Sequence, residues 1–89
     1  MKIVYTKHAL KKFVTLAKLG IKITKRQIKE VIYDPSHLDI EEDFPNKIAS
    51  SELDSQHVLR VAYREKDDIM QVITFYPAKK GRYYETQKK

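Results

Sequence analysis

The sequence contains no cysteine and no tryptophan, and only two glycines and three prolines among its 89 residues. Without cysteine, the chain can form no disulfide, no iron–sulfur cluster and no thiolate zinc site. A small domain that folds without disulfides is typical of a reducing compartment, so we expect a cytoplasmic protein. The low glycine and proline content argues against disorder and against collagen-like repeats. These features favour a small globular domain.

Long apolar runs are also missing. No segment approaches the roughly 20 apolar residues of a membrane-spanning helix, so no membrane partner is expected. The first twelve residues, MKIVYTKHALKK, lack the uninterrupted apolar segment of a signal peptide. The length suits one domain, which we place at residues 1–84, with a frayed basic tail at 85–89.

The net charge is +6, but the charges are unevenly distributed along the chain. Acidic residues are scarce in its first and last parts, and acidic residues outnumber basic ones in the middle. Residues 1–30 hold nine Lys or Arg and one acid, whereas residues 31–68 hold four basic and ten acidic residues. Residues 69–89 are basic again, with five basic residues and one acid. Such segregation favours a polyanionic partner. The alternative is a solvated lysine-rich surface of the kind found in heat-adapted proteins.

Two helices are predicted in the first part of the chain. Thr6 is expected to cap a helix that Gly20 ends. Its buried face is expected from the spacing of four apolar residues, namely Leu10, Phe13, Val14 and Ala17. Thr24 and Gln27 form a T-x-x-Q capping box, which predicts a second helix ending before Pro35.

After Pro35 the pattern changes to an alternation typical of strands. Segments 46–53, 57–65 and 69–76 are predicted strands, and 36–43 is an acidic loop or a short edge strand. Residues 1–6 form a short strand or an extended lead-in. The fold class is therefore α+β, with an N-terminal αα-hairpin packed on a curved three- to four-stranded antiparallel sheet.

The strand at 57–65 divides its side chains between two faces. Leu59, Val61 and Tyr63 are expected to lie under the helices. Arg60 and Arg64 would then project from the open face. They could form a pair that binds an anion, or they could form ion pairs with acidic residues of segment 36–54.

Cations and aromatic residues together suggest RNA. Phosphates bind lysine and arginine, and bases stack on aromatic rings. The residues predicted to bind RNA are Lys11, Lys25, Arg26, Lys29, Lys79, Arg82 and Tyr83. The alternatives are a solvated helix surface and, for the tyrosines of the tail, simple packing onto the sheet.

None of the three histidines has the spacing of a metal site, so no metal and no cofactor are expected. His37 carries no functional signal, and His57 is expected to be exposed at the start of a strand. His8 lies near a helix N-terminus, close to Lys11 and Lys12. The helix N-terminus and the two lysines both disfavour the imidazolium, and a neutral imidazole can act as a general base. The alternative is a histidine that packs at the helix start.

Four phrases, TKHALKKF, LGIKITKRQIKEVIYDP, LRVAYRE and VITFYPAKKGRYY, resemble the motifs of a bacterial and archaeal family of small proteins without an agreed function. Its pattern is a histidine-alanine opening with a cation four residues later, a V-x-Y-R strand and a V-T-x-Y-P strand. That family has been grouped with the RelE-like, barnase-like and EndoU-like ribonuclease fold. Many RelE-like proteins are toxins of toxin–antitoxin pairs.

The resemblance implies a RelE-like fold and catalytic roles for His8, Lys12, Arg60, Arg64 and Tyr76. His8 would be the base or the acid of a metal-independent cleavage at a 2′-OH, and the cations would stabilise the phosphate charge. Tyr76 would stack a base or supply a proton. Lys12 replaces the arginine more usual in the family, and lysine lacks its bidentate geometry.

Two functions stay open at this point. One is an RNA-engaging, metal-independent endoribonuclease of the toxin type. The other is a non-catalytic interaction module that binds RNA or an acidic, antitoxin-like protein. If His8 and the strand arginines share one surface, catalysis is favoured, and if they lie on opposite faces, the module is favoured.

Overall fold

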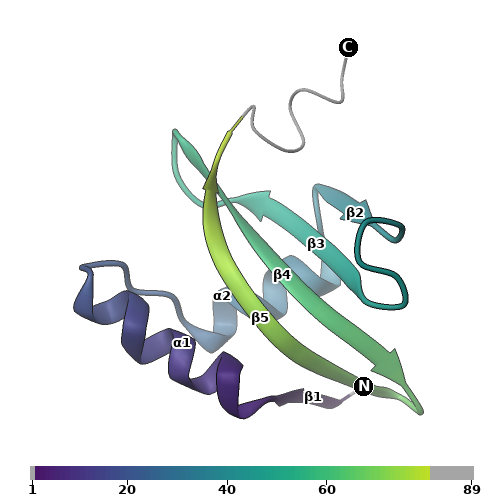
Figure 1. The fold of residues 1–89 in the computed structure, drawn as a ribbon. Coiled ribbons are helices and arrows are strands. Elements are labelled where there is room, and N and C mark those ends of the chain that lie inside the picture. Colours follow the sequence, from purple (N-terminus) through teal and green to yellow (C-terminus); the bar gives the residue numbers. More distant parts are fainter. Residues whose placement is uncertain (1, 81–89) are drawn as a thin grey trace.

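The computed structural model describes residues 2–80, in which two helices cover one face of a five-stranded sheet (Figure 1). The elements in chain order are β1 (Lys2–Tyr5), α1 (Lys7–Lys18), α2 (Lys25–Tyr33), β2 (His37–Asp39), β3 (Lys47–Glu52), β4 (His57–Lys66) and β5 (Ile69–Lys79). The predicted α+β class and the N-terminal pair of helices are confirmed. The predicted tail at 85–89 lies outside the described residues.

The sheet has the strand order β1-β5-β4-β3-β2. Strands β2 to β5 are antiparallel to their neighbours, but β1 pairs with β5 in parallel, with Ile3 opposite Met70 and Tyr5 opposite Val72. The expected three- to four-stranded antiparallel sheet is therefore wrong. The sheet is mixed and larger, because the first residues join the edge of the last strand. This long-range pairing has no local sequence signal.

Thr6 joins the start of α1 to the sheet. Its Oγ1 accepts a hydrogen bond from the Ala9 N–H at 3.0 Å and donates one to the Ile73 carbonyl at 3.1 Å. Ile73 is the extra residue of a bulge in β5, since Ala62 pairs with Thr74 while the next residue of β4 pairs with Val72. The predicted N-cap is confirmed, and it also fixes how α1 meets the bulge.

The buried face of α1 differs from the expected one. Ala9 and Leu16 are buried, and Phe13 packs partly buried against the core, whereas Leu10 and Val14 are 45% and 56% exposed. Both sets have helical spacing, so the pattern alone does not distinguish them. The helix is therefore rotated relative to the expected orientation. This rotation of α1 follows from tertiary contacts, because the Phe13 ring packs against Phe75, with 4.6 Å between ring centroids.

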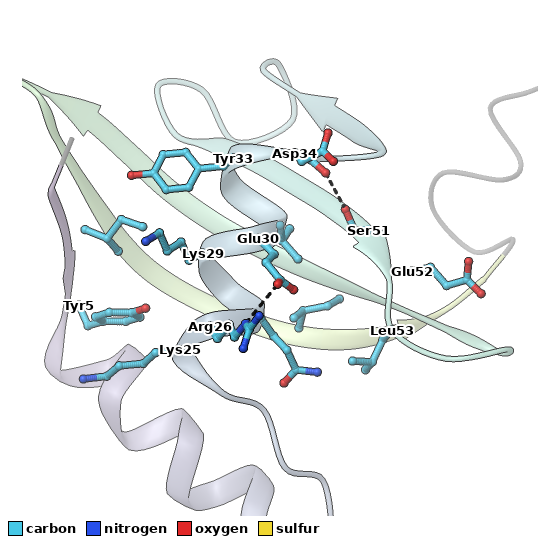
Figure 2. A pocket seen from close by; sticks show the side chains of 14 residues that line it. Tyr5, Lys25, Arg26, Lys29, Glu30, Tyr33, Asp34, Ser51, Glu52 and Leu53 are labelled. Atoms are coloured by element: carbon cyan, nitrogen blue, oxygen red, sulfur yellow. Dashed lines mark hydrogen bonds and ion pairs between the residues drawn. The ribbon is translucent and has the colours of Figure 1, made fainter.

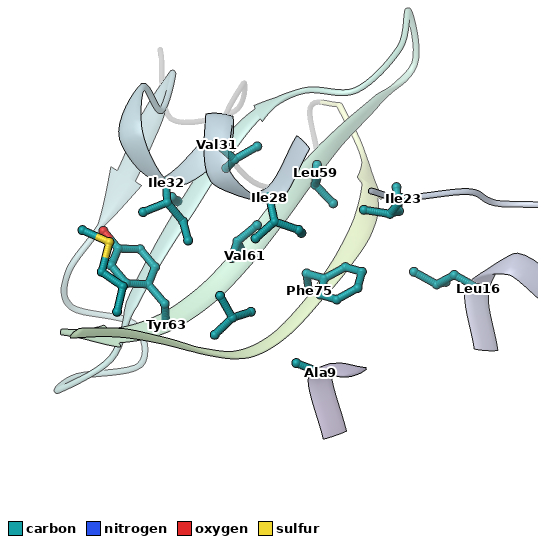
Figure 3. Close-up of a cluster of buried hydrophobic side chains, with 13 residues drawn as sticks. Ala9, Leu16, Ile23, Ile28, Val31, Ile32, Leu59, Val61, Tyr63 and Phe75 are labelled. Atoms are coloured by element: carbon teal, nitrogen blue, oxygen red, sulfur yellow. The ribbon is translucent and has the colours of Figure 1, made fainter. Parts of the chain in front are cut away.

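The capping box of α2 is present as predicted. The Thr24 N–H donates to Gln27 Oε1 at 2.8 Å, and the Gln27 N–H donates to Thr24 Oγ1 at 3.2 Å. Ile28, Val31 and Ile32 are buried. They lie over the strand residues that were expected beneath the helices (Figure 3), namely Leu59, Val61 and Tyr63.

Within residues 2–80, no helix combines the length and apolar character that a membrane span requires.

Candidate nucleic-acid interface

The two helices form a basic layer. Residues 2–29 contain nine Lys or Arg and no Asp or Glu. Seven of these cations are exposed on or between the helices: Lys7, Lys11, Lys18, Lys22, Lys25, Arg26 and Lys29. Because α1 and α2 lie on the same face of the sheet, the fold collects these charges on one side of the molecule (Figure 1).

Four acidic residues that follow lie away from this layer. Asp39, Glu41, Glu42 and Asp43 occur at and just after β2, the edge strand at the opposite end of the sheet from β1. The separation in space is partial, because Glu30 of α2 and Asp34 at its C-terminal end belong to the helix layer. A field of this kind attracts anions toward the helices.

A depression of about 1020 Å³ surrounds α2 (Figure 2). Its wall on one side comes from Ile3 and Tyr5 of β1. On the other side of the helix it is lined by residues 51–53, at the end of β3. The depression thus has two sides, here called the first groove, between α2 and β1, and the second groove, between α2 and the end of β3, and cations of α2 line it.

Two tyrosines lie beside lysines in the first groove. The Lys25 Nζ is 5.1 Å from the centroid of the Tyr5 ring, and the Lys29 Nζ is 5.9 Å from that of Tyr33. All four side chains lie on the same side of α2 in Figure 2. Burial raises the pKa of the Tyr5 hydroxyl above its usual value of 10.0, so this ring is neutral at physiological pH. Aromatic rings flanked by cations are the usual means of holding single-stranded nucleic acid.

Arg26 points to the second groove. Its Nε lies 3.5 Å from Glu30 Oε2, in a pair whose side chains are 87% and 65% exposed. An exposed pair of this kind contributes little to stability, so Arg26 can exchange Glu30 for another anion at small cost.

The predicted RNA-binding residues are only partly brought together. Lys25, Arg26 and Lys29 line the depression around α2. Lys11 is exposed on α1, and Lys79 is exposed at the end of β5. Arg82 and Tyr83 lie outside the described residues.

Tyr5 and Tyr33 were missed as binding residues. Tyr33 follows Lys29 by four positions on one helix, a spacing that places the two side chains side by side and could have revealed it. Tyr5 had no such signal, because its place beside Lys25 depends on the pairing of β1 with β5.

The predicted catalytic residues lie on opposite sides of the sheet. His8 is exposed on α1, and Lys12 is half-buried one turn later. Arg60 alternates with Leu59 and Val61, which pack under the helices, so its side chain points to the other face. The structure therefore does not bring His8 to Arg60. Their catalytic roles remain predictions.

Arg60 was expected to project from an open face, and this is wrong. The residue is only 3% exposed. Its Nη2 donates to Glu42 Oε1 at 3.2 Å, and its guanidinium lies 5.7 Å from the centroid of the Tyr76 ring. Glu42 belongs to segment 36–54, so the pair matches the ion-pair alternative. Arg64 is exposed, as predicted, and donates from Nε to Asn46 Oδ1 at 3.1 Å.

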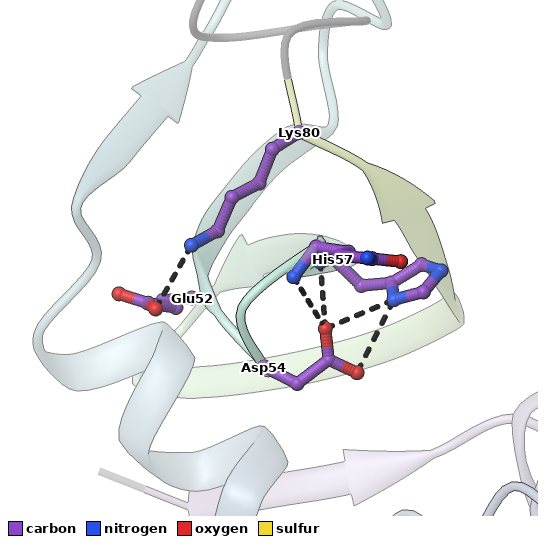
Figure 4. A network of polar contacts seen from close by, with 5 residues as sticks. Glu52, Asp54, His57 and Lys80 are labelled. Atoms are coloured by element: carbon purple, nitrogen blue, oxygen red, sulfur yellow. Dashed lines mark hydrogen bonds and ion pairs between the residues drawn. The ribbon is translucent and has the colours of Figure 1, made fainter.

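A polar network closes the turn between β3 and β4 (Figure 4). Asp54 Oδ1 accepts the backbone N–H groups of Gln56 and His57, each at 2.8 Å, and contacts His57 Nδ1 at 2.9 Å. These hydrogen bonds, that from Gln56 above all, lower the pKa of Asp54. Lys80 donates to Glu52 at 2.8 Å and ties the end of β5 to the same region. His57 is half-buried, not exposed as expected, and the network serves the turn.

In the part of the chain that the structure describes, no group of three or more His, Asp or Glu side chains is placed to hold a metal ion. No family model, no curated protein and no solved structure matches the chain. The resemblance to a RelE-like family thus stays a prediction.

Proposed function

We propose that the protein is an RNA-binding module that holds single-stranded RNA on its helix layer, along α2. The observation that carries this proposal is the set of seven exposed cations on the helix layer, two of which, Lys25 and Lys29, lie beside tyrosine rings. Lysine and arginine bind the phosphates, and the rings of Tyr5 and Tyr33 stack bases. A merely solvated lysine surface would need neither the groove nor the paired rings.

The non-catalytic module is favoured over the ribonuclease. Cleavage needs a general base and a charge-stabilising group that reach one phosphate. His8 and Arg60 lie on opposite faces of the sheet, so the described residues do not assemble the predicted site. A RelE-like fold is part of the proposal and is supported by the order of elements, in which the two helices precede strands β2 to β5. A cytoplasmic location is supported by the lack of cysteine.

Binding is tested with a fluorescently labelled single-stranded RNA and two charge-matched variants. Lys29→Glu reverses a charge in the groove, while Lys66→Glu reverses an exposed charge at the end of β4. We expect Lys29→Glu to weaken binding by about tenfold, and Lys66→Glu by less than about threefold, because losing a phosphate contact costs more than changing the net charge. Equal losses of RNA affinity in the two variants would mean that binding depends only on the overall charge of the protein.

Two further measurements separate the alternatives. Incubation of the RNA with wild type and His8→Ala should give no cleavage with either, and a wild-type cleavage lost in His8→Ala would restore the ribonuclease. An acidic peptide, such as oligoglutamate, should compete only weakly for the groove. Competition as strong as that of RNA would favour an acidic protein partner instead.

A further inference from the structure

The face of the sheet away from the helices carries a line of polar side chains. His37 of β2 pairs with Ser50 of β3, Ser50 pairs with Arg60 of β4, and Arg60 pairs with Tyr76 of β5. Directly paired residues point to the same face. These four residues, here called the polar row, therefore cross four neighbouring strands (Figure 1).

The neighbouring positions on this face are of two kinds. Four are buried and apolar, namely Ile48, Val58, Ala62 and Ala78, and three are polar, namely Asp39, Glu52 and Thr74. Within the row, Ser50 is 2% and Arg60 is 3% exposed, while His37 and Tyr76 are half-buried. A guanidinium in such a site requires an anionic partner, and the low dielectric strengthens that interaction.

The partner in this structure is Glu42, which comes from a loop and not from the sheet. The Arg60 side chain is 4% exposed, whereas that of Glu42 is 54% exposed. The loop between β2 and β3 is held by Asp39, whose Oδ1 accepts the N–H groups of Glu41 and Glu42 at 2.9 and 3.0 Å. A fixed, buried cation thus meets an acid on an exposed segment, and such segments move more readily than strands.

We propose that the polar row is a binding site for a phosphate oxyanion and that Glu42 is its built-in competitor. Arg60 supplies the charge and two parallel donors, which suit phosphate. Ser50 has a small side chain and a hydroxyl donor. His37 stands across it from Arg60, at a backbone separation of about 10 Å, two strand spacings. The ring of Tyr76 orients the guanidinium. A ligand phosphate takes the place of the Glu42 carboxylate, and the loop opens.

This site does not depend on the proposed RNA surface, because it lies on the opposite face of the sheet. Its chemistry is that of phosphate, which can come from a free phosphate compound or from an RNA backbone. Glu42 makes the site responsive, since only a ligand that outcompetes a carboxylate gains access to Arg60.

The test uses full-length protein, inorganic phosphate and the matched variants Glu42→Gln and Glu41→Gln, which remove the same charge from adjacent positions. Removing the competitor should tighten phosphate binding by about tenfold in Glu42→Gln, because a hydrogen bond to a charged group is lost from the unliganded state only. Glu41→Gln should change it by less than about twofold. In NMR spectra of Glu42→Gln, phosphate should shift the His37 and Tyr76 ring signals. Equal affinities in the two variants, or shifts confined to the helix layer, would overturn the proposal.

Two titrations of Glu42→Gln identify the source of the phosphate, in a Lys25→Glu/Lys29→Glu background that removes the helix surface. If a short single-stranded RNA binds as strongly as a nucleoside monophosphate, the row serves an RNA backbone. If only the monophosphate binds, the row serves a free phosphate compound. Failure of both to bind overturns the site, while leaving the proposed RNA surface untouched.

Discussion

At the scale of single residues, Thr6 shows how one hydroxyl can serve two elements. The same Oγ1 caps α1 and donates to the carbonyl of Ile73, the extra residue of the bulge in β5. A capping residue is recognised from sequence, because the spacing of serine, threonine, asparagine and aspartate before a helix is local. The hydrogen bond from Thr6 to Ile73 cannot be recognised in this way, since the two residues lie 67 positions apart.

Replacing Thr6 should test this double role. Thr6→Val keeps the shape of the side chain but removes the hydroxyl, so it should destabilise the fold by about 2 kcal/mol, the sum of a lost cap and a lost hydrogen bond to the Ile73 carbonyl. Thr6→Ser keeps the hydroxyl and should cost less than about 1 kcal/mol. Urea denaturation of both variants measures the difference. Equal midpoints would mean that the hydroxyl contributes nothing.

At the scale of elements, the β4–β5 hairpin depends on a strained turn. Asp67 and Asp68 have φ of 52° and 64°, the left-handed values of a type I′ turn. Asp67 and Asp68 form the charged turn between the two strands. The turn is short enough to be read from sequence, although neither aspartate is the residue best suited to it.

Substitution at Asp68 should report that strain. Asp68→Gly and Asp68→Ala both remove the carboxylate, so any charge effect cancels between them. The glycine variant should be more stable by about 1–2 kcal/mol, because only a residue with a Cβ is penalised at positive φ. Thermal or chemical denaturation of the pair decides this. A more stable alanine variant would contradict the turn geometry.

The β3–β4 turn should make stability depend on pH. The pKa of Asp54 is below its usual value of 3.8, chiefly because of the N–H of Gln56. A lowered folded pKa means that the stabilisation is complete above the unfolded pKa and is lost as pH falls through the folded pKa. Melting temperature should therefore fall below about pH 4 in wild type, and less steeply in Asp54→Asn. The melting temperature of Glu41→Gln, a control for net charge, should fall with pH as that of wild type does. Parallel curves for wild type and Asp54→Asn would contradict the role of Asp54.

Local patterns predicted the elements well but not how they meet. The capping box of α2 and the alternation around Leu59 were both confirmed, because they depend on neighbours in sequence. The parallel pairing of β1 and the rotation of α1 depend on contacts with β5, more than 50 residues later. For the same reason the alternation predicted the face of Arg60 but not its burial beneath Glu42.

At the scale of the whole molecule, the fold converts charge segregation in sequence into two unlike faces. The helix layer is basic and lies beside Tyr5 and Tyr33. The opposite face holds the buried Arg60, which forms an ion pair with Glu42 of an acidic loop. RNA on the helix layer and phosphate at the polar row would be recognised by different physics. The first depends on many exposed charges that salt screens, and the second on one desolvated arginine that salt screens less.

This difference gives a prediction for salt dependence. For the helix layer, the logarithm of RNA affinity should fall linearly with the logarithm of salt concentration, because bound phosphates release counterions. Lys25→Glu with Lys29→Glu should weaken binding to all sequences alike and flatten this slope by about one to two units, on the order of one for each lost contact. Glu42→Gln should leave the slope unchanged, since its site lies on the other face. Binding of labelled RNA at several salt concentrations measures all three slopes. If the double lysine variant kept the wild-type slope, the RNA would have to bind elsewhere, and the cations around α2 would be a solvated surface only.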